Sequence, residues 1–151
     1  MTKVLLLEDD QTRVEWLQEH FPSFKITWHM TVKSFVEDYR SSEWDLVVFD
    51  YDLTPDFLQP TWINDNWVLN FHQNESARFD CDKDDYNGGD AVMMFPEGNE
   101  NQKILVWSAN AHGAYSMTKN LRAKGYTKVV QQKFEYRGNA KLREIIMELM
   151  S

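Results

Sequence analysis

Five short runs of apolar character alternate with five helix-like segments along this chain of 151 residues. The runs at residues 3–7 and 45–50 are nearly continuous in apolar residues, which is typical of strands buried on both faces of a sheet. Parallel neighbours in a sheet must be joined by crossover connections, and helices usually make them. The alternation therefore predicts an α/β fold, with a parallel sheet and helices on both of its faces.

The predicted elements follow from apolar periodicity and from capping residues. Strands are expected at residues 3–7, 24–28, 45–50, 104–107 and 128–131. Helices are expected at residues 13–20, 32–39, 90–95, 114–121 and 142–149, four of them from apolar residues spaced three and four apart. Three of the helices are predicted to be capped by Thr31, Asn110 and Asn139, and Gly125 is predicted to end the fourth helix.

Residues 54–88 differ from the rest of the chain. They are rich in Asn, Asp and aromatic residues and show no sustained period. We predict a long insertion here, directly after the third strand, containing a hairpin whose turn is Asn64-Asp65-Asn66. Since 151 residues fit one domain better than two, the chain is otherwise predicted to form a single domain, 1–151.

Charge and cysteine content exclude several classes of protein. The chain has 24 Asp and Glu against 16 Lys and Arg, and the net charge of −8 disfavours binding to nucleic acid and to anionic membranes. The single cysteine, Cys81, permits no intramolecular disulfide, which suits a reducing compartment. The first apolar run is too short for a signal peptide or a membrane span. We therefore expect a soluble cytoplasmic protein, with no output domain after the fifth helix.

Polar residues gather where the predicted strands end. In open parallel sheets, ligands bind outside the carboxyl ends of the strands. Acidic residues at this edge repel one another unless a cation neutralises them, and oxygen ligands favour a hard ion such as Mg²⁺, or Mn²⁺. We predict a shared metal site there, although Asp10 is explained equally well as a helix cap. The residues expected at this edge are Glu8, Asp9, Asp10, Asp50, Asp52, Ser108, Asn110, and either Gln132 or Lys133.

Four segments, taken in order, resemble the receiver domain of bacterial response regulators. They are Leu5-Leu6-Leu7-Glu8-Asp9-Asp10, Leu46-Val47-Val48-Phe49-Asp50, Val106-Trp107-Ser108-Ala109 and Lys133-Phe134. The resemblance implies a flavodoxin-like three-layer sandwich whose five strands lie in the order 2-1-3-4-5. It covers nearly the whole chain except residues 54–88.

The receiver resemblance also implies roles for individual residues. Asp9 would bind Mg²⁺ directly, Glu8 would assist through water, and Asp50 would be both a metal ligand and the nucleophile that accepts a phosphoryl group. Ser108 would donate a hydrogen bond to a phosphoryl oxygen, and Lys133 would supply the cation. The proline that follows this lysine in the family is missing here, and the spacing from Gly125 would equally place Gln132 in the lysine's position.

A closer resemblance is to a receiver-like branch known as the cyclic-phosphate processing receiver domain. It is carried by Asp50-Tyr51-Asp52-Leu53 and by Ser108-Ala109-Asn110 with Gly113 and Met117. Tyr51 and Trp107 stand where that branch has histidines; if those histidines carry the branch's chemistry, we expect this chain to keep the scaffold and metal site but to have lost or altered catalysis. Asp52 is interpreted either as a further metal ligand or as a cap of the turn before Pro55.

Three functions remain open from the sequence, and whether the protein is an enzyme is undecided. The first is a stand-alone regulatory receiver that is phosphorylated on Asp50 and acts through a protein partner or phosphodonor. The second is a metal-dependent phosphoesterase acting on a small cyclic or terminal phosphate ester. The third is a pseudo-receiver that binds a protein partner without chemistry. All three depend on whether Asp9 and Asp50 converge around one cation.

Overall fold

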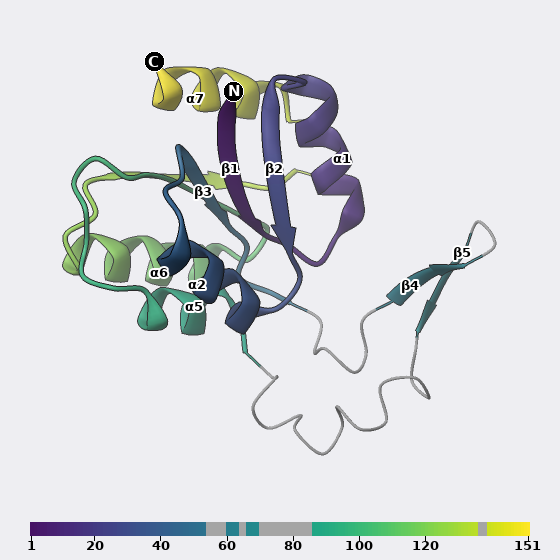
Figure 1. Ribbon diagram of the computed structural model, residues 1–151, viewed down its shortest axis with the longest axis horizontal. Coiled ribbons are helices and arrows are strands. Elements are labelled where there is room, and N and C mark those ends of the chain that lie inside the picture. Colours follow the sequence, from purple (N-terminus) through teal and green to yellow (C-terminus); the bar gives the residue numbers. More distant parts are fainter. Residues whose placement is uncertain (54–59, 64–65, 70–85, 136–138) are drawn as a thin grey trace.

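The computed structural model describes residues 1–53, 60–63, 66–69, 86–135 and 139–151 (Figure 1). Most of the predicted insertion lies outside these residues, as do Asn64, Asp65 and Cys81 and the turn at Pro55. Within the insertion, β4 (Pro60–Ile63) and β5 (Asn66–Leu69) pair in antiparallel fashion, which confirms the predicted hairpin. Asn66 was predicted in the turn, but it pairs with Ile63 and belongs to β5.

The main sheet has five parallel strands, as predicted. They are β1 (Thr2–Leu7), β2 (Phe24–His29), β3 (Leu46–Phe49), β6 (Lys103–Ser108) and β7 (Lys128–Lys133). Their order across the sheet is β2-β1-β3-β6-β7, which confirms the predicted order 2-1-3-4-5. All four ladders are parallel, so the carboxyl ends of the strands lie at one edge of the sheet.

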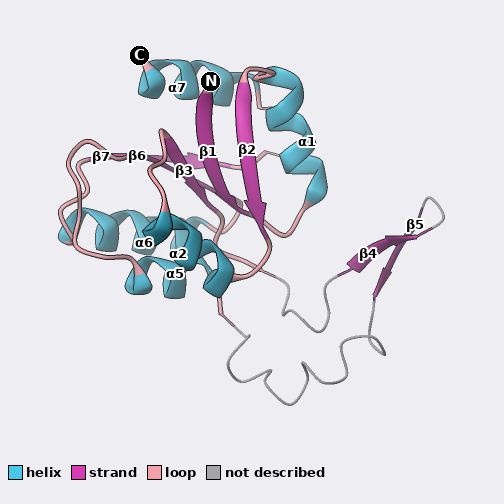
Figure 2. Ribbon diagram, viewed as in Figure 1, coloured by secondary structure: helices cyan, strands magenta, loops and turns pink. Residues whose placement is uncertain are grey.

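Helices cover both faces of this sheet and complete the predicted three layers (Figure 2). One face packs against α2 (Val32–Ser41), α5 (Gly88–Met94) and α6 (Ala111–Ala123). The other face packs against α1 (Gln11–His20) and α7 (Ala140–Met150). In β1, Leu5 and Leu7 join the first cluster whereas Val4 and Leu6 join the second. The strand is thus buried on both faces, which is why its sequence is continuously apolar.

Three of the four predicted helix boundaries are confirmed by side-chain or backbone geometry. The Thr31 hydroxyl accepts from the Ser34 N–H, and the Asn110 carbonyl oxygen accepts from the Gly113 N–H. Gly125 follows α6 with a φ of 102°, a left-handed conformation that favours glycine. Asn139 precedes α7 but does not cap it, because its side chain is engaged by both backbone polar groups of Glu135.

Element limits differ from the prediction mainly at the strand and helix ends near the site. β7 continues two residues further, to Lys133, and α5 begins at Gly88, which was predicted to lie in the insertion. Asn87 forms a capping box with Asp90 and so starts α5 earlier than expected. Among the helices of the described part of the chain, none has the length and apolar character needed to cross a membrane.

Candidate metal centre

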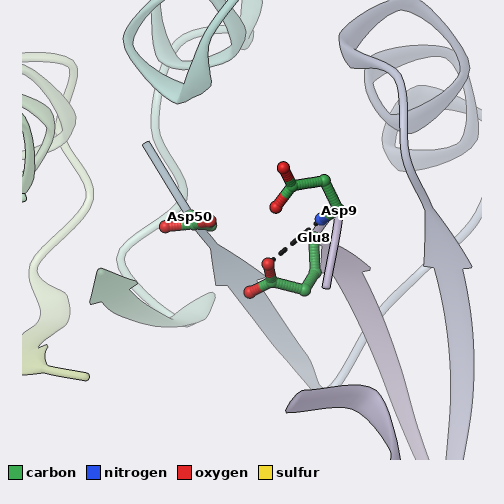
Figure 3. Close-up of side chains that lie close together, drawn as sticks. All are labelled: Glu8, Asp9 and Asp50. Atoms are coloured by element: carbon green, nitrogen blue, oxygen red, sulfur yellow. Dashed lines mark hydrogen bonds between the residues drawn. The ribbon is translucent and has the colours of Figure 1, made fainter. Parts of the chain in front are cut away.

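Three carboxylates from two strand ends converge at the carboxyl edge of the sheet. Glu8 and Asp9 follow β1, and Asp50 follows β3; one carboxylate oxygen from each lies within 4.8 Å of the others (Figure 3). Backbone ladders continue past the strands to hold them there, since the Glu8 N–H donates to His29 O at 3.0 Å and the Asp50 N–H donates to Leu7 O at 3.1 Å. The geometric condition on which the sequence prediction depended, that Asp9 and Asp50 meet, is fulfilled.

Two of these acids are almost completely buried. Glu8 is 1% exposed and Asp50 is 3% exposed, whereas Asp9 is half-buried. Burial, reinforced by the nearby charge of Asp50, raises the pKa of Glu8 well above its ordinary value. Burial likewise raises the pKa of Asp50 to about 6, although Arg13 opposes the rise. These buried acids ionise together only where a cation compensates their charge, and an all-oxygen set suits Mg²⁺ or Mn²⁺.

Both carboxylates also accept hydrogen bonds from nearby backbone N–H groups. Glu8 Oε1 accepts from the N–H groups of Asp9 and Asp10, at 3.0 and 3.1 Å. Asp50 Oδ1 accepts from the Tyr51 N–H at 2.8 Å. These contacts fix one oxygen of each acid and so orient the other. Asp10 itself caps α1, because its Oδ1 accepts from the Thr12 N–H, as the alternative interpretation of this residue predicted.

Arg13 is the residue of this site that sequence analysis missed. Its guanidinium Nη1 lies 3.1 Å from Glu8 Oε2 and 3.2 Å from Asp50 Oδ2, and the side chain is 7% exposed. Although burial lowers the pKa of Arg13, the charges of Glu8 and Asp50 outweigh it and raise that pKa. The signal was spacing: Arg13 lies four residues before Leu17, and both face the core on α1. A charged residue on a buried helical stripe needs a buried partner.

Two further predicted residues, Ser108 and Asp52, line the hollow beside Asp50; the hollow has a volume of about 250 Å³. Ser108 ends β6, is buried, and lines the hollow; its hydrogen bond to Asp50 lowers the pKa of that acid, against the larger effect of burial. Asp52 also lines the hollow but is not part of the three-carboxylate cluster. Its carboxylate instead accepts from Asn110 Nδ2, at 3.3 and 3.4 Å.

Lys133 and Gln132 lie at the end of β7. The sheet register places Lys133 opposite Ser108 and Gln132 opposite Trp107, so Lys133 is level with the last residue of β6. However, Lys133 is exposed, does not line the hollow, and makes no ion pair with an acid in the described part of the chain. Lys133, which the receiver resemblance gives as the cation for a phosphoryl group, therefore does not share the hollow with Asp50, and its predicted role stays a prediction.

Two glycines allow the helices to pack closely against the segment after β3. A Cβ on Gly88 would lie 2.0 Å from Asp50 O, and a Cβ on Gly113 would lie 2.2 Å from the Tyr51 ring. The Gly88 N–H also donates to Tyr51 O at 2.8 Å. The first turns of α5 and α6 thus hold the backbone of Asp50 and the ring of Tyr51 in place.

Comparison with known proteins identifies the fold. No family model and no curated protein matches this sequence. Among solved structures, the chain resembles the HemR receiver domain of Leptospira biflexa with 20% identity and a TM-score of 0.61, over 100% of this chain and 95% of that one. It resembles the response regulator TrrA of Thermotoga maritima, solved with Mg²⁺ and a beryllium fluoride, with 16% identity and a TM-score of 0.59, over 99% of each chain.

A third structure, of the CheX–CheY–BeF3–Mg complex from Borrelia burgdorferi, matches with 17% identity and a TM-score of 0.59, over 99% of this chain and 90% of that one. This chain has the fold of response regulator receiver domains. The finer resemblance to the cyclic-phosphate processing branch stays a prediction.

Proposed function

We propose that this chain is a receiver-type regulatory domain in which Asp50 accepts a phosphoryl group with the help of Mg²⁺ or Mn²⁺. The observation that carries the proposal is the convergence of Glu8, Asp9 and Asp50 at the carboxyl edge of a receiver fold. Solved receiver domains of this fold include one described as activated by BeF3, and two others were solved in complexes that contain both Mg²⁺ and a beryllium fluoride.

The charges of the site suit a divalent cation. Glu8, Asp9 and Asp50 carry three negative charges when ionised and Arg13 carries one positive charge, which leaves −2. Asp9 and Asp50 would hold the ion, with Glu8 beside it. When bound, the cation would draw charge away from the phosphoryl oxygens and from the attacking carboxylate.

The transfer itself is a simple displacement at phosphorus. An oxygen of the Asp50 carboxylate forms a bond to the phosphorus of an acyl phosphate or of a phosphohistidine donor. The bond from phosphorus to the donor oxygen or nitrogen breaks, and the leaving group keeps the electron pair. The product is a mixed anhydride on Asp50. Ser108 is proposed to donate its hydroxyl to a phosphoryl oxygen, since it lines the same hollow as Asp50.

The readout of phosphorylation is proposed to be a protein contact. One solved neighbour is a CheY bound to a second protein, CheX, in the presence of BeF3 and Mg²⁺. A phosphoryl group at Asp50 would alter the charge beside Ser108 and the start of α6, where Asn110 bonds to Ser108 Oγ through its N–H at 3.1 Å. A change at this point can be transmitted to the surface of α6 and β7.

Beryllofluoride with Mg²⁺ tests the proposal directly. We expect the backbone amide signals of Ser108 and Tyr51 to shift in nuclear magnetic resonance spectra when both are added to the protein. The Asp50→Asn variant should show no shift, and the Asp45→Asn variant, which removes an exposed acid at the opposite edge, should respond like the parent protein. Absence of any shift in the parent protein would contradict the proposal and favour a pseudo-receiver.

A second candidate, metal-dependent hydrolysis of a cyclic phosphate ester, is supported by one contact. Asp52 and Asn110 carry the resemblance to the cyclic-phosphate processing branch; they are hydrogen-bonded to each other, and Asp52 lines the hollow that contains Asp50. We expect any such activity to require both Asp50 and Asp52. A panel of cyclic phosphates with Mg²⁺ or Mn²⁺ measures it, and turnover that survives Asp52→Asn would exclude this role for the pair.

A further inference from the structure

Arg13 is an unusual residue to find buried at an acidic site. It comes from the first half of α1, is 6% exposed, and places one guanidinium nitrogen between Glu8 and Asp50. The plane of the group lies over the Phe134 ring, with Cζ 3.7 Å from the ring centroid, and Trp107 is 5.8 Å away. Two carboxylates and two aromatic rings therefore compensate the cost of taking this cation out of water.

The guanidinium still has unused binding capacity. It carries five N–H donors in a fixed plane, and Nε is buried without a hydrogen-bond partner among the described residues. Arg13 also lines the hollow that contains Asp50 and Ser108. A planar, permanently charged group with free donors beside a nucleophile is suited to bind the oxygens of a phosphoryl group.

Lys133 has the opposite properties. It is exposed, it does not line the hollow, and it makes no ion pair with a described acid. The next residue, Phe134, turns its ring toward Arg13 and is buried. Its N–H donates to Ser108 O at 3.1 Å, which fixes the end of β7 beside β6. The end of β7 thus supplies an aromatic platform for the guanidinium of α1.

We propose that Arg13, and not Lys133, is the cation that binds the phosphoryl group on Asp50. The inference rests on the function proposed above. In the unphosphorylated protein the guanidinium binds the Asp50 carboxylate, and on transfer it binds the oxygens of the new phosphoryl group. Glu8 keeps its contact with Nη1 throughout and acts as a positioning residue, since it holds the guanidinium at the reacting carboxylate.

The experiment measures two affinities in each of four proteins. The proteins are the parent chain, Arg13→Gln, Lys133→Gln, and Arg143→Gln, the last being a charge-matched control on the exposed side of α7. One titration uses Mg²⁺ alone, and the other uses beryllofluoride at saturating Mg²⁺. The indole N–H signal of Trp107 reports both, because that ring lies beside Arg13.

The two affinities should move in different directions when Arg13 is replaced. Loss of a charge-assisted contact should weaken beryllofluoride binding by roughly 10- to 100-fold in Arg13→Gln. Mg²⁺ binding should be equal or tighter, because a positive charge has been removed beside the metal ligands. Lys133→Gln should change beryllofluoride affinity by less than about threefold, as expected for an exposed charge. Arg143→Gln should change neither.

The outcomes separate the inference from the function on which it rests. No beryllofluoride response in the parent chain would defeat the proposed function itself. A normal parent response that is lost in Lys133→Gln would overturn the role of Arg13. Equal weakening of Mg²⁺ and beryllofluoride binding in Arg13→Gln would indicate a structural role and would overturn it too. Should Arg13→Gln not fold, Arg13→Lys replaces it; loss of the planar guanidinium should still weaken beryllofluoride binding more than Lys133→Gln does, and an unchanged beryllofluoride affinity in Arg13→Lys would overturn the inference.

Discussion

Both edges of the parallel sheet carry charged residues, but the surroundings of these residues differ between the two edges. The amino edge has the larger hollow, about 790 Å³, lined by residues that include Lys3, Trp44, Asp45 and Gln102. Asp45 Oδ2 accepts from the Lys3 N–H at 2.8 Å, and the Lys3 ammonium lies 4.8 Å from the Trp44 ring. The hollow at the carboxyl edge is about a third of that size, at about 250 Å³.

Burial of charge, not the size of the hollow, distinguishes the edge that carries the candidate site. At the amino edge, Lys3 and Asp45 are exposed, so water stabilises their charges and their contacts contribute little free energy. At the carboxyl edge, Glu8, Asp50 and Arg13 are buried and must be stabilised by one another or by a ligand. Clusters of buried, perturbed charges of this kind gather at functional sites, which makes this edge the candidate site.

The largest expected effect is the loss of metal binding on removing the charge of Asp50. Asp50→Asn should abolish measurable Mg²⁺ binding, because one of the two proposed direct ligands becomes a neutral amide in a buried position. Asp45→Asn, an identical change at the amino edge, should leave Mg²⁺ affinity unchanged. Isothermal titration calorimetry measures both affinities. Equal losses of Mg²⁺ affinity in the two variants would contradict the expected difference between the edges.

A smaller effect is expected when neighbouring acids of the same loop are compared. Asp9→Asn should weaken Mg²⁺ binding by about 100-fold, as typical changes in metal-site residues do. Asp10→Asn should weaken it by less than about threefold, since Asp10 is the cap of α1 and asparagine is an equally good cap. Comparable losses in the two variants would mean that net charge, and not placement of the ligands, governs the site.

The pH dependence of stability should also separate the edges. The folded-state pKa of Asp50 is about 6, above the ordinary 3.8, so folding favours its protonated form. In the presence of a chelator, the contribution of Asp50 to the unfolding free energy is fully present below about pH 4 and is lost as pH rises through about 6. The loss of unfolding free energy is on the order of 3 kcal/mol. Urea unfolding between pH 4 and 8 should show that the unfolding free energy declines less in Asp50→Asn than in the parent protein. In Asp45→Asn it should decline as much as in the parent.

The fold could be predicted from the sequence because burial on both faces leaves a plain pattern. Continuous apolar runs such as Val4–Leu7 can lie only at the centre of a covered sheet, and the parallel order follows from the crossovers. Whether Asn139 caps α7 could not be predicted in this way. The same asparagine can bond to its own helix or to the preceding turn, and the contact with Glu135 prevails.

The candidate site was predictable only in part. Acids at the ends of β1 and β3 must lie together once the strands are neighbours, so Asp9 and Asp50 were placed correctly. Arg13 was missed because Val14 fits the apolar spacing of α1 one position later, and yet Arg13 is the more deeply buried of the two. Which of two adjacent helical residues faces the core depends on the rotation of the helix, and a three-residue apolar pattern does not determine it.

The smallest expected effect tests the amino edge for hidden coupling to the site. Gln102 is 8% exposed, and its Nε2 donates to Trp44 O at 3.1 Å and to Lys103 O at 3.2 Å. Gln102→Met keeps the volume but removes these donors, so unfolding free energy should fall by about 1 kcal/mol. Mg²⁺ affinity should stay the same, because the lost hydrogen bonds join Gln102 to Trp44 and to the first residue of β6, at the edge opposite the carboxylates. A shift in Mg²⁺ affinity would instead show that the strands transmit strain from one edge to the other, and the carboxyl edge could then no longer be treated as an independent site.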